Sequence, residues 1–270
     1  MLIRIGYEIV HDCPQPTPML LLLHTHFSRV SDFVRPDHMI VSPSVPMDAY
    51  RDGFGNWCTR IVAPAGPTTV TADALIRDSG QPDPALYSAA QHPVEELPAE
   101  VLTFLLGSRY CETDRLMEAA WDLFGHTPPG WQRVQAICDY VHNHITFDYF
   151  RARPTMTALD VFNERFGVCR DYTHLAIAFL RCLNIPARYC TGYLSDIGFE
   201  PTEPDFAAWL EVWLNGGWRI FDPRNNTPRY GRILIARGRD ATDVPISLTF
   251  GPNTLQSFRV WTYPVDDAAN

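Results

Sequence analysis

The sequence predicts an α+β fold: an N-terminal antiparallel β-sandwich, then a core in which a cysteine-bearing helix packs on an antiparallel sheet. Three observations support this. Residues 3–9 alternate apolar and other side chains, which is typical of a strand with one buried face. From Cys169 onward, apolar residues recur at helical spacing until Pro186. Asn215 and Gly216 separate two alternating apolar runs, which is a strong hairpin signal.

The N-terminal region contains short strand patterns separated by turn residues. Alternating or continuous apolar runs cover 3–9, 20–27 and 57–62, and a turn-rich segment occupies 52–56. Strands at short intervals with prolines between them indicate an antiparallel sandwich over residues 1–90. We expect no chemistry in this part of the chain.

A proline- and acid-rich passage from Gln81 to Pro98 marks the predicted boundary between two domains, 1–90 and 91–270. Beyond it, helical spacing predicts helices over 99–104, 113–124 and 131–145. Thr157 is a suitable N-cap for a further helix over 158–162. This helix leads the chain to the glycine that precedes the central helix.

The central helix begins at Cys169. The first turn of a helix has unpaired N–H groups and a partial positive charge, which favour a thiolate and can bind a developing oxyanion. A cysteine nucleophile is well placed there. The alternative is that Cys169 is one more small buried apolar residue.

Strand patterns follow the central helix over 187–194, 208–214 and 218–222. With a two-residue turn at Asn215 and Gly216, residues 207, 209 and 222 share one face of the sheet. If Gly217 joins the turn, the register slips by one and Asp222 moves to the opposite face. Two later runs, 233–236 and 258–263, are predicted to complete the same sheet.

Composition narrows the classes of function. The chain has 270 residues and a net charge of −9, which argues against nucleic acid or an anionic membrane as a partner. The N-terminus has no signal-peptide h-region and no apolar run is long enough to span a bilayer. Seven cysteines without CxxC spacing suit a reducing compartment, and we expect a cytoplasmic location. No zinc-site spacing is present.

Four segments in this order resemble the bacterial transglutaminase-like family of papain-type thiol enzymes. They are Gly-Val-Cys-Arg-Asp-Tyr-Thr-His-Leu at 167–175, Asn-Ile-Pro-Ala-Arg-Tyr at 184–189, Asp-Phe-Ala-Ala-Trp-Leu-Glu at 205–211 and Phe-Asp-Pro-Arg-Asn-Asn-Thr at 221–227. The N-terminal part of the chain, with Asp-Gly-Phe-Gly-Asn at 52–56, is similar to the β-sandwich domain that often precedes this core. The resemblance implies a transglutaminase-like core, acyl transfer from a peptide or small amide, and no cofactor or metal. The sequence does not choose between water and an amine as acceptor, whereas the resemblance favours a peptidase or amidase over a protein crosslinker.

By this resemblance, the catalytic Cys and Asp of the family correspond to Cys169 and Asp222, and Ala207 occupies the position of the catalytic His. A thiol enzyme needs an adjacent base to hold the thiolate and to protonate the leaving amine. We therefore expect the catalytic activity of this chain to be severely impaired. Around the triad, Tyr149 is expected either to assist the oxyanion site or to cap the pocket, and Trp209 to form core and pocket wall.

Other histidines are weak candidates for the missing base. His174 lies five residues after Cys169 on the same helix, about 140° further round, and is expected to be a buried, hydrogen-bonded residue. His142 and His144 precede the site, and nothing in their spacing places them beside Cys169.

Three interpretations of Ala207 remain open. The first is deliberate replacement of the base by alanine, the second is a natural non-catalytic module that binds a peptide or amide, and the third is catalysis with another base. Cys169 and Asp222 are retained, although a chain long released from catalysis has no chemical reason to keep the thiol. This favours a single change at position 207. The oligomeric state cannot be inferred from the sequence.

Overall fold

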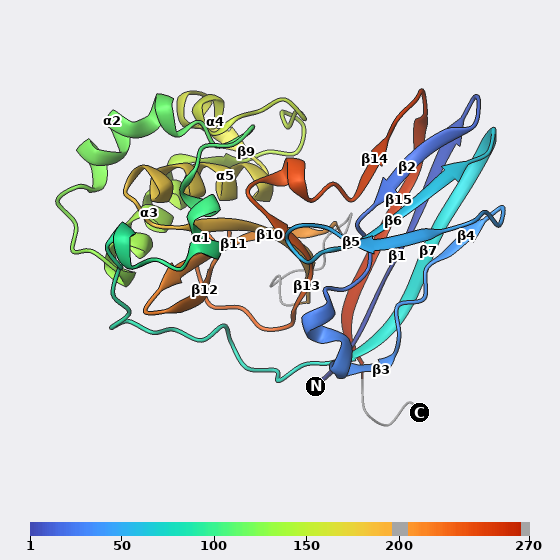
Figure 1. Ribbon diagram of the computed structural model, residues 1–270, viewed down its shortest axis with the longest axis horizontal. Coiled ribbons are helices and arrows are strands. Elements are labelled where there is room, and N and C mark those ends of the chain that lie inside the picture. Colours follow the sequence, from blue (N-terminus) through green and yellow to red (C-terminus); the bar gives the residue numbers. More distant parts are fainter. Residues whose placement is uncertain (196–204, 266–270) are drawn as a thin grey trace.

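The computed structural model describes residues 1–195 and 205–265 and has an α+β architecture, as predicted. Figure 1 shows two bodies side by side, a β-sandwich and a body in which helices cover a smaller sheet. The buried apolar residues of both bodies form one continuous cluster. The predicted division into 1–90 and 91–270 stays a prediction.

The sandwich consists of two antiparallel sheets. One contains β15 (Thr254–Val265), β1 (Leu2–Cys13), β7 (Gly66–Arg77), β3 (Phe33–Arg35) and β4 (Ile40–Ser42). The other contains β14 (Ser247–Thr249), β2 (Thr17–Leu21), β6 (Trp57–Ala63) and β5 (Asp48–Arg51). Ile3, Ile5, Tyr7 and Ile9 alternate along β1 and are buried, which explains the predicted strand pattern.

The C-terminal strand corrects one prediction. We expected residues 233–236 and 258–263 both to complete the core sheet. β13 (Arg232–Gly238) does so, by pairing with β10 (Ala187–Leu194). β15 instead returns to the sandwich and pairs with β1 from Leu2 to Asp12. Sequence periodicity gives the strand but not its partner, because pairing between residues about 250 positions apart leaves no local signal.

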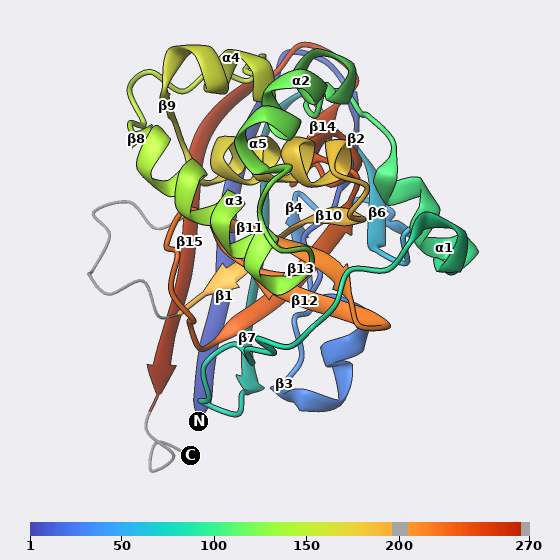
Figure 2. The ribbon, with the colours of Figure 1, turned by 90° about the vertical axis from the view of Figure 1, so that its left-hand side faces the viewer.

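The core surrounds one helix. Helices α1 (Ala99–Leu102), α2 (Thr113–Phe124), α3 (Trp131–His144) and α4 (Ala158–Glu164) precede α5 (Cys169–Cys182). Short 3-10 turns also occur: η1 (Phe27–Asp32), η2 (Val94–Glu96), η3 (Thr103–Leu105) and η4 (Ala241–Asp243). Figure 2 shows α2, α3 and α4 around α5. Along the described parts of the chain, no helix has the length and apolar character needed to cross a membrane.

The helix boundaries follow local signals. Thr157 accepts a hydrogen bond from the Asp160 N–H, which confirms it as the N-cap of α4, and Asp160 accepts one from the Thr157 N–H to complete a capping box that was not predicted. At the C-terminal end of α5, Asn184 has a φ of 59°, a left-handed conformation in which the helix cannot continue. The extents of α2 and α3 match the periodicity that predicted them.

The core sheet has the order β12-β11-β10-β13, with β11 at Ala207–Leu214 and β12 at Gly217–Phe221. Leu214 pairs with Gly217 across a two-residue turn, which confirms the predicted register over the slipped one. Asn215 and Gly216 have φ angles of 51° and 72°, as the tight hairpin turn requires. α5 packs on β10 and β11.

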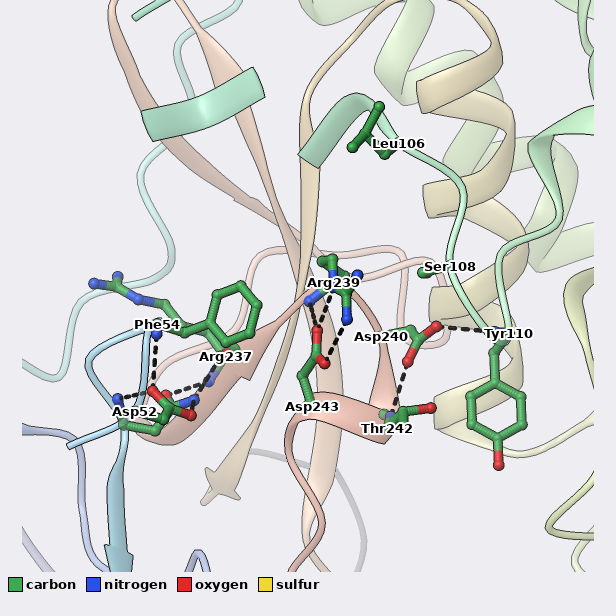
Figure 3. Close-up of polar contacts among 12 residues, drawn as sticks. Asp52, Phe54, Leu106, Ser108, Tyr110, Arg237, Arg239, Asp240, Thr242 and Asp243 are labelled. Atoms are coloured by element: carbon green, nitrogen blue, oxygen red, sulfur yellow. Dashed lines mark hydrogen bonds and ion pairs between the residues drawn. The ribbon is translucent and has the colours of Figure 1, made fainter. Parts of the chain in front are cut away.

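Polar contacts join the sandwich to the core sheet (Figure 3). The Asp52 carboxylate accepts hydrogen bonds from the Phe54 and Asn56 N–H groups and closes the 52–56 turn. The Asn56 side chain then donates to the Arg237 carbonyl and accepts from the Arg237 N–H, at 2.7 and 2.9 Å. Nearby, Asp240 accepts from the Tyr110 N–H. The turn thus binds β13 much as a paired strand would.

We expect Gly216→Ala to lower the free energy of unfolding by about 1–2 kcal/mol, because a Cβ is disfavoured at positive φ. No atom lies within 4 Å of the position its Cβ would take, so the cost is conformational rather than steric. Gly217→Ala is the matched control, because that position has no positive φ and its nearest contact is 3.5 Å away. Urea unfolding of both variants tests this, and equal effects would contradict it.

Candidate active site

Cys169 is the first residue of α5, and a buried carboxylate fixes the start of the helix. Asp171 accepts a hydrogen bond from the Val168 N–H at 2.9 Å and another from Arg170 Nε at 2.9 Å. A Cβ on Gly167 would lie 2.7 Å from the Asp171 Cβ, which explains the need for glycine there. These contacts place Cys169 at a defined position at the helix N-terminus.

A two-stranded parallel ladder brings the segment of Tyr149 close to the nucleophile. β8 (Thr146–Phe147) pairs with β9 (Phe166–Gly167), and the Asp148 N–H donates to the Gly167 carbonyl at 3.1 Å. Tyr149 is 55% exposed and its ring contacts Phe147. Tyr149 therefore lies at the rim of the site, and its role at an oxyanion stays a prediction.

The backbone at the start of β11 approaches the sulfur. The Ala208 N–H interacts with the Cys169 sulfur and lowers the pKa of the thiol. Ala207, the first residue of β11, is half-buried and pairs with Gly192 of β10. The position where the resemblance expects a histidine thus directly precedes the residue whose N–H lowers the pKa of Cys169.

Asp222 follows β12 directly and is held from several sides. Its Oδ1 accepts from the Asn225 N–H at 3.0 Å, and its Oδ2 accepts from Asn225 Nδ2 at 2.8 Å. Arg232 Nη2 donates to the same Oδ2 at 2.7 Å. Trp209 is buried, with the Arg232 guanidinium 5.2 Å from its ring centre. Arg232 thus contacts both Asp222 and Trp209, as expected if these two share a face.

The electrostatic surroundings keep Cys169 protonated. Burial, and after it the Asp205 carboxylate, raise the pKa of the Cys169 thiol to about 12. The helix N-terminus alone predicts a lowered pKa for this thiol, whereas its surroundings as a whole raise the pKa. The physical reason is that carboxylates and a half-buried position oppose the negative thiolate, and the Ala208 N–H compensates for only part of this.

The three histidines considered from the sequence have structural contacts. His174 is buried, its Nε2 accepts from the Ala241 N–H, and burial lowers its pKa to about 3. This confirms the prediction of a buried, hydrogen-bonded helix residue. His142 Nδ1 lies 3.1 Å from the carbonyls of Pro223 and Arg224, and His144 Nε2 lies 2.7 Å from that of Phe162. Among hydrogen bonds of the described residues, none joins a histidine ring to the Cys169 sulfur.

Sequence analysis missed Arg232 and Asp83. Arg232 Nε donates to Asp83 Oδ2 at 2.8 Å, so Arg232 joins Asp222 to the passage between the two bodies. An arginine at the start of a strand, ten residues after Asp222, follows no motif or periodicity. Only the fold brings the three side chains together.

A cavity of about 60 Å³ borders Asp222 on the side of α3. Its walls come from α3, β12, the turn after Asp222 and residues 83–85, and Cys169 is not among its lining residues. The volume suits a few water molecules. Within 1–195 and 205–265, no group of three or more His, Cys, Asp or Glu side chains is arranged to hold a metal ion.

Comparison with known proteins places these residues in a family. A model of the transglutaminase-like superfamily core matches residues 121–223, which include Cys169, Ala207 and Asp222. An uncharacterized protein of Mycobacterium tuberculosis is 30% identical over 238 residues, covering 77% of this chain and 74% of the relative. The crystal structure of a candidate cysteine protease from Cytophaga hutchinsonii superposes with a TM-score of 0.85 at 29% identity, covering 100% of this chain and 92% of that one.

We expect Asp205→Asn to increase the rate at which iodoacetamide alkylates Cys169 at pH 8. Asp205 raises the pKa of the thiol, so loss of its charge lowers that pKa and increases the thiolate fraction. Peptide mass mapping at Cys169 measures the rate. Asp48→Asn, on the exposed edge strand β5, is the control and should leave the rate unchanged. An unchanged rate in Asp205→Asn would contradict this account of the thiol.

Proposed function

Because the chain belongs to the transglutaminase-like superfamily, we propose that it acts on peptides or small amides by Cys169-dependent acyl transfer, with its activity severely impaired by Ala207. The observation that carries the proposal is that Ala207 begins β11 directly before Ala208, whose N–H is near enough to the Cys169 sulfur to lower the pKa of the thiol. It supports a histidine at position 207 as the partner of the thiol. The assignment is supported by the superfamily match over residues 121–223, a range that contains Cys169, position 207 and Asp222.

The proposed reaction has two steps. The Cys169 sulfur attacks the amide carbonyl, and the oxyanion that forms is near the N–H groups of the first turn of α5. The C–N bond then breaks, the amine leaves with a proton, and a thioester remains. Water or a second amine attacks the thioester, releases an acid or a new amide, and returns the proton to sulfur.

Position 207 limits the first step. The leaving amine needs a proton, and alanine supplies none. A thiol with a pKa of about 12 is also almost entirely protonated near neutral pH. General acid–base catalysis is worth about 10²–10⁴-fold in rate. We therefore propose that the chain binds its substrate amide but turns it over very slowly.

A second candidate function is a non-catalytic module that holds a peptide or amide in the same cleft. The favouring observation is that Asp222 already has Arg232 and Asn225 as partners and does not need a histidine to be satisfied. For either function we propose a reducing, cytoplasmic location, since all seven cysteines are free thiols.

We expect Ala207→His to increase the rate of acyl transfer from tryptic peptides of casein by about 10²-fold or more. Mass spectrometry in the presence and absence of hydroxylamine separates amine transfer from hydrolysis. Ala207→Gln is the matched control, because glutamine has a similar size but no titratable ring. Ala207→His/Cys169→Ser should be inactive. If Ala207→His remains inactive, the binding-module function is favoured.

Free imidazole offers a test without mutation. If Ala207 is the only defect, imidazole at high concentration should enter the space beside Cys169 and increase the rate of acyl transfer. Ala207→Phe should abolish that gain by filling the space. If imidazole does not increase the rate in the unmodified chain, this would contradict the hypothesis that the active site lacks only its base.

A further inference from the structure

The buried guanidinium of Arg232 connects the triad carboxylate to the rest of the protein. Its side chain is 5% exposed, and those of Asp222 and Asp83 are 3% and 14% exposed. Nη2 binds Asp222 at 2.7 Å and Nε binds Asp83 at 2.8 Å. A buried carboxylate that loses such a partner is strongly destabilised. The orientation of Asp222 therefore depends on Arg232.

The two carboxylate oxygens of Asp222 accept different numbers of hydrogen bonds. Oδ2 accepts from both Arg232 Nη2 and Asn225 Nδ2, whereas Oδ1 accepts from the Asn225 N–H alone among the described residues. Two donors on Oδ2 fix the plane of the carboxylate. Oδ1 retains acceptor capacity for one more donor, such as the Nδ1–H of an imidazole.

Arg232 is itself held in place. Its carbonyl accepts a hydrogen bond from Arg29 Nη1 at 2.9 Å, which fixes the start of β13 against η1 of the sandwich. Its guanidinium lies 5.2 Å from the centre of the Trp209 ring. Two carboxylates and one guanidinium leave this cluster with one formal negative charge, which an imidazolium would neutralise. The cluster thus favours a cationic base beside it.

We propose that Arg232 is a positioning residue, which orients the Asp222 carboxylate so that Oδ1 receives the ring N–H of a base at position 207. The inference rests on the proposed function, because it assumes that a histidine at position 207 acts on Cys169. Arg232 acts through Asp222 and does not touch the reacting atoms.

The test is a double-mutant cycle on positions 207 and 232, with alkylation of Cys169 by iodoacetamide at pH 6 and pH 10 as the readout. In the Ala207→His background, Arg232→Met should reduce the rate at pH 6 by at least about tenfold, because a misoriented imidazole no longer holds the thiolate. The rate at pH 10 should change little. In the unmodified chain, Arg232→Met should affect neither rate, since no imidazole connects Asp222 to the sulfur.

Two further variants separate positioning from a general structural role. Arg232→Lys keeps the positive charge but cannot bond both Asp222 and Asp83 as the guanidinium does. Its pH 6 alkylation rate in the Ala207→His background should therefore lie between the rates with arginine and with methionine. Arg188→Met is the matched control, because Arg188 is also a buried arginine of the core sheet but pairs with Glu211, so the pH 6 rate should stay unchanged. Thermal unfolding of every variant shows whether it folds. If Arg232→Met reduces the rate equally in both backgrounds, or in neither, the proposal is overturned.

A second measurement is independent of sulfur reactivity. In Ala207→His, proton NMR should show a slowly exchanging imidazole Nδ1–H, and Arg232→Met should remove that signal. If the signal is present and depends on Arg232 but Cys169 is unreactive at pH 6, the proposed acyl transfer fails while the positioning role stands. If the signal persists in Arg232→Met, the positioning role fails whatever the activity.

Discussion

The site depends on the burial of α5 on every side. All residues from Asp171 to Cys182 are buried, under other helices on some sides and the core sheet on another. At the far end of the helix, Arg181 donates to the carbonyls of Leu106, Ala187 and Arg239. A buried guanidinium must satisfy its donors, so these contacts set the position of the helix along its axis. Cys169 has little freedom to move as a result.

The charges around Cys169 explain why the reactivity of the thiol depends on the side chain at position 207. Asp205, Asp171 and Asp222 all raise the pKa of the thiol. Such surroundings stabilise a thiolate only when a cation lies against it. Arg232 pairs with Asp222, but its charge is shared between two carboxylates. The same three carboxylates that disfavour a lone thiolate would favour a thiolate paired with an imidazolium.

Local patterns allowed much of the fold and part of the site to be predicted. The Asn215-Gly216 turn fixed the register of β11 and β12, and the Thr157 cap located the start of α4. Both signals act over a few residues. The partner of β15 and the contacts of Arg232 could not be predicted, because they join residues that are distant in the sequence and follow no periodicity. The raised pKa of Cys169 also depends on the folded positions of carboxylates.

Because β15 pairs with β1, the sandwich cannot be completed until the last described strand has been synthesised. During synthesis, β1 emerges first and carries a row of buried apolar residues, yet its partner on one side is the last described strand. Until β15 arrives, β1 is an edge strand with unpaired N–H and C=O groups. The transglutaminase-like core between them is therefore an insertion within the sandwich. A chain that stopped after the core would have its site nearly complete but would expose an aggregation-prone edge.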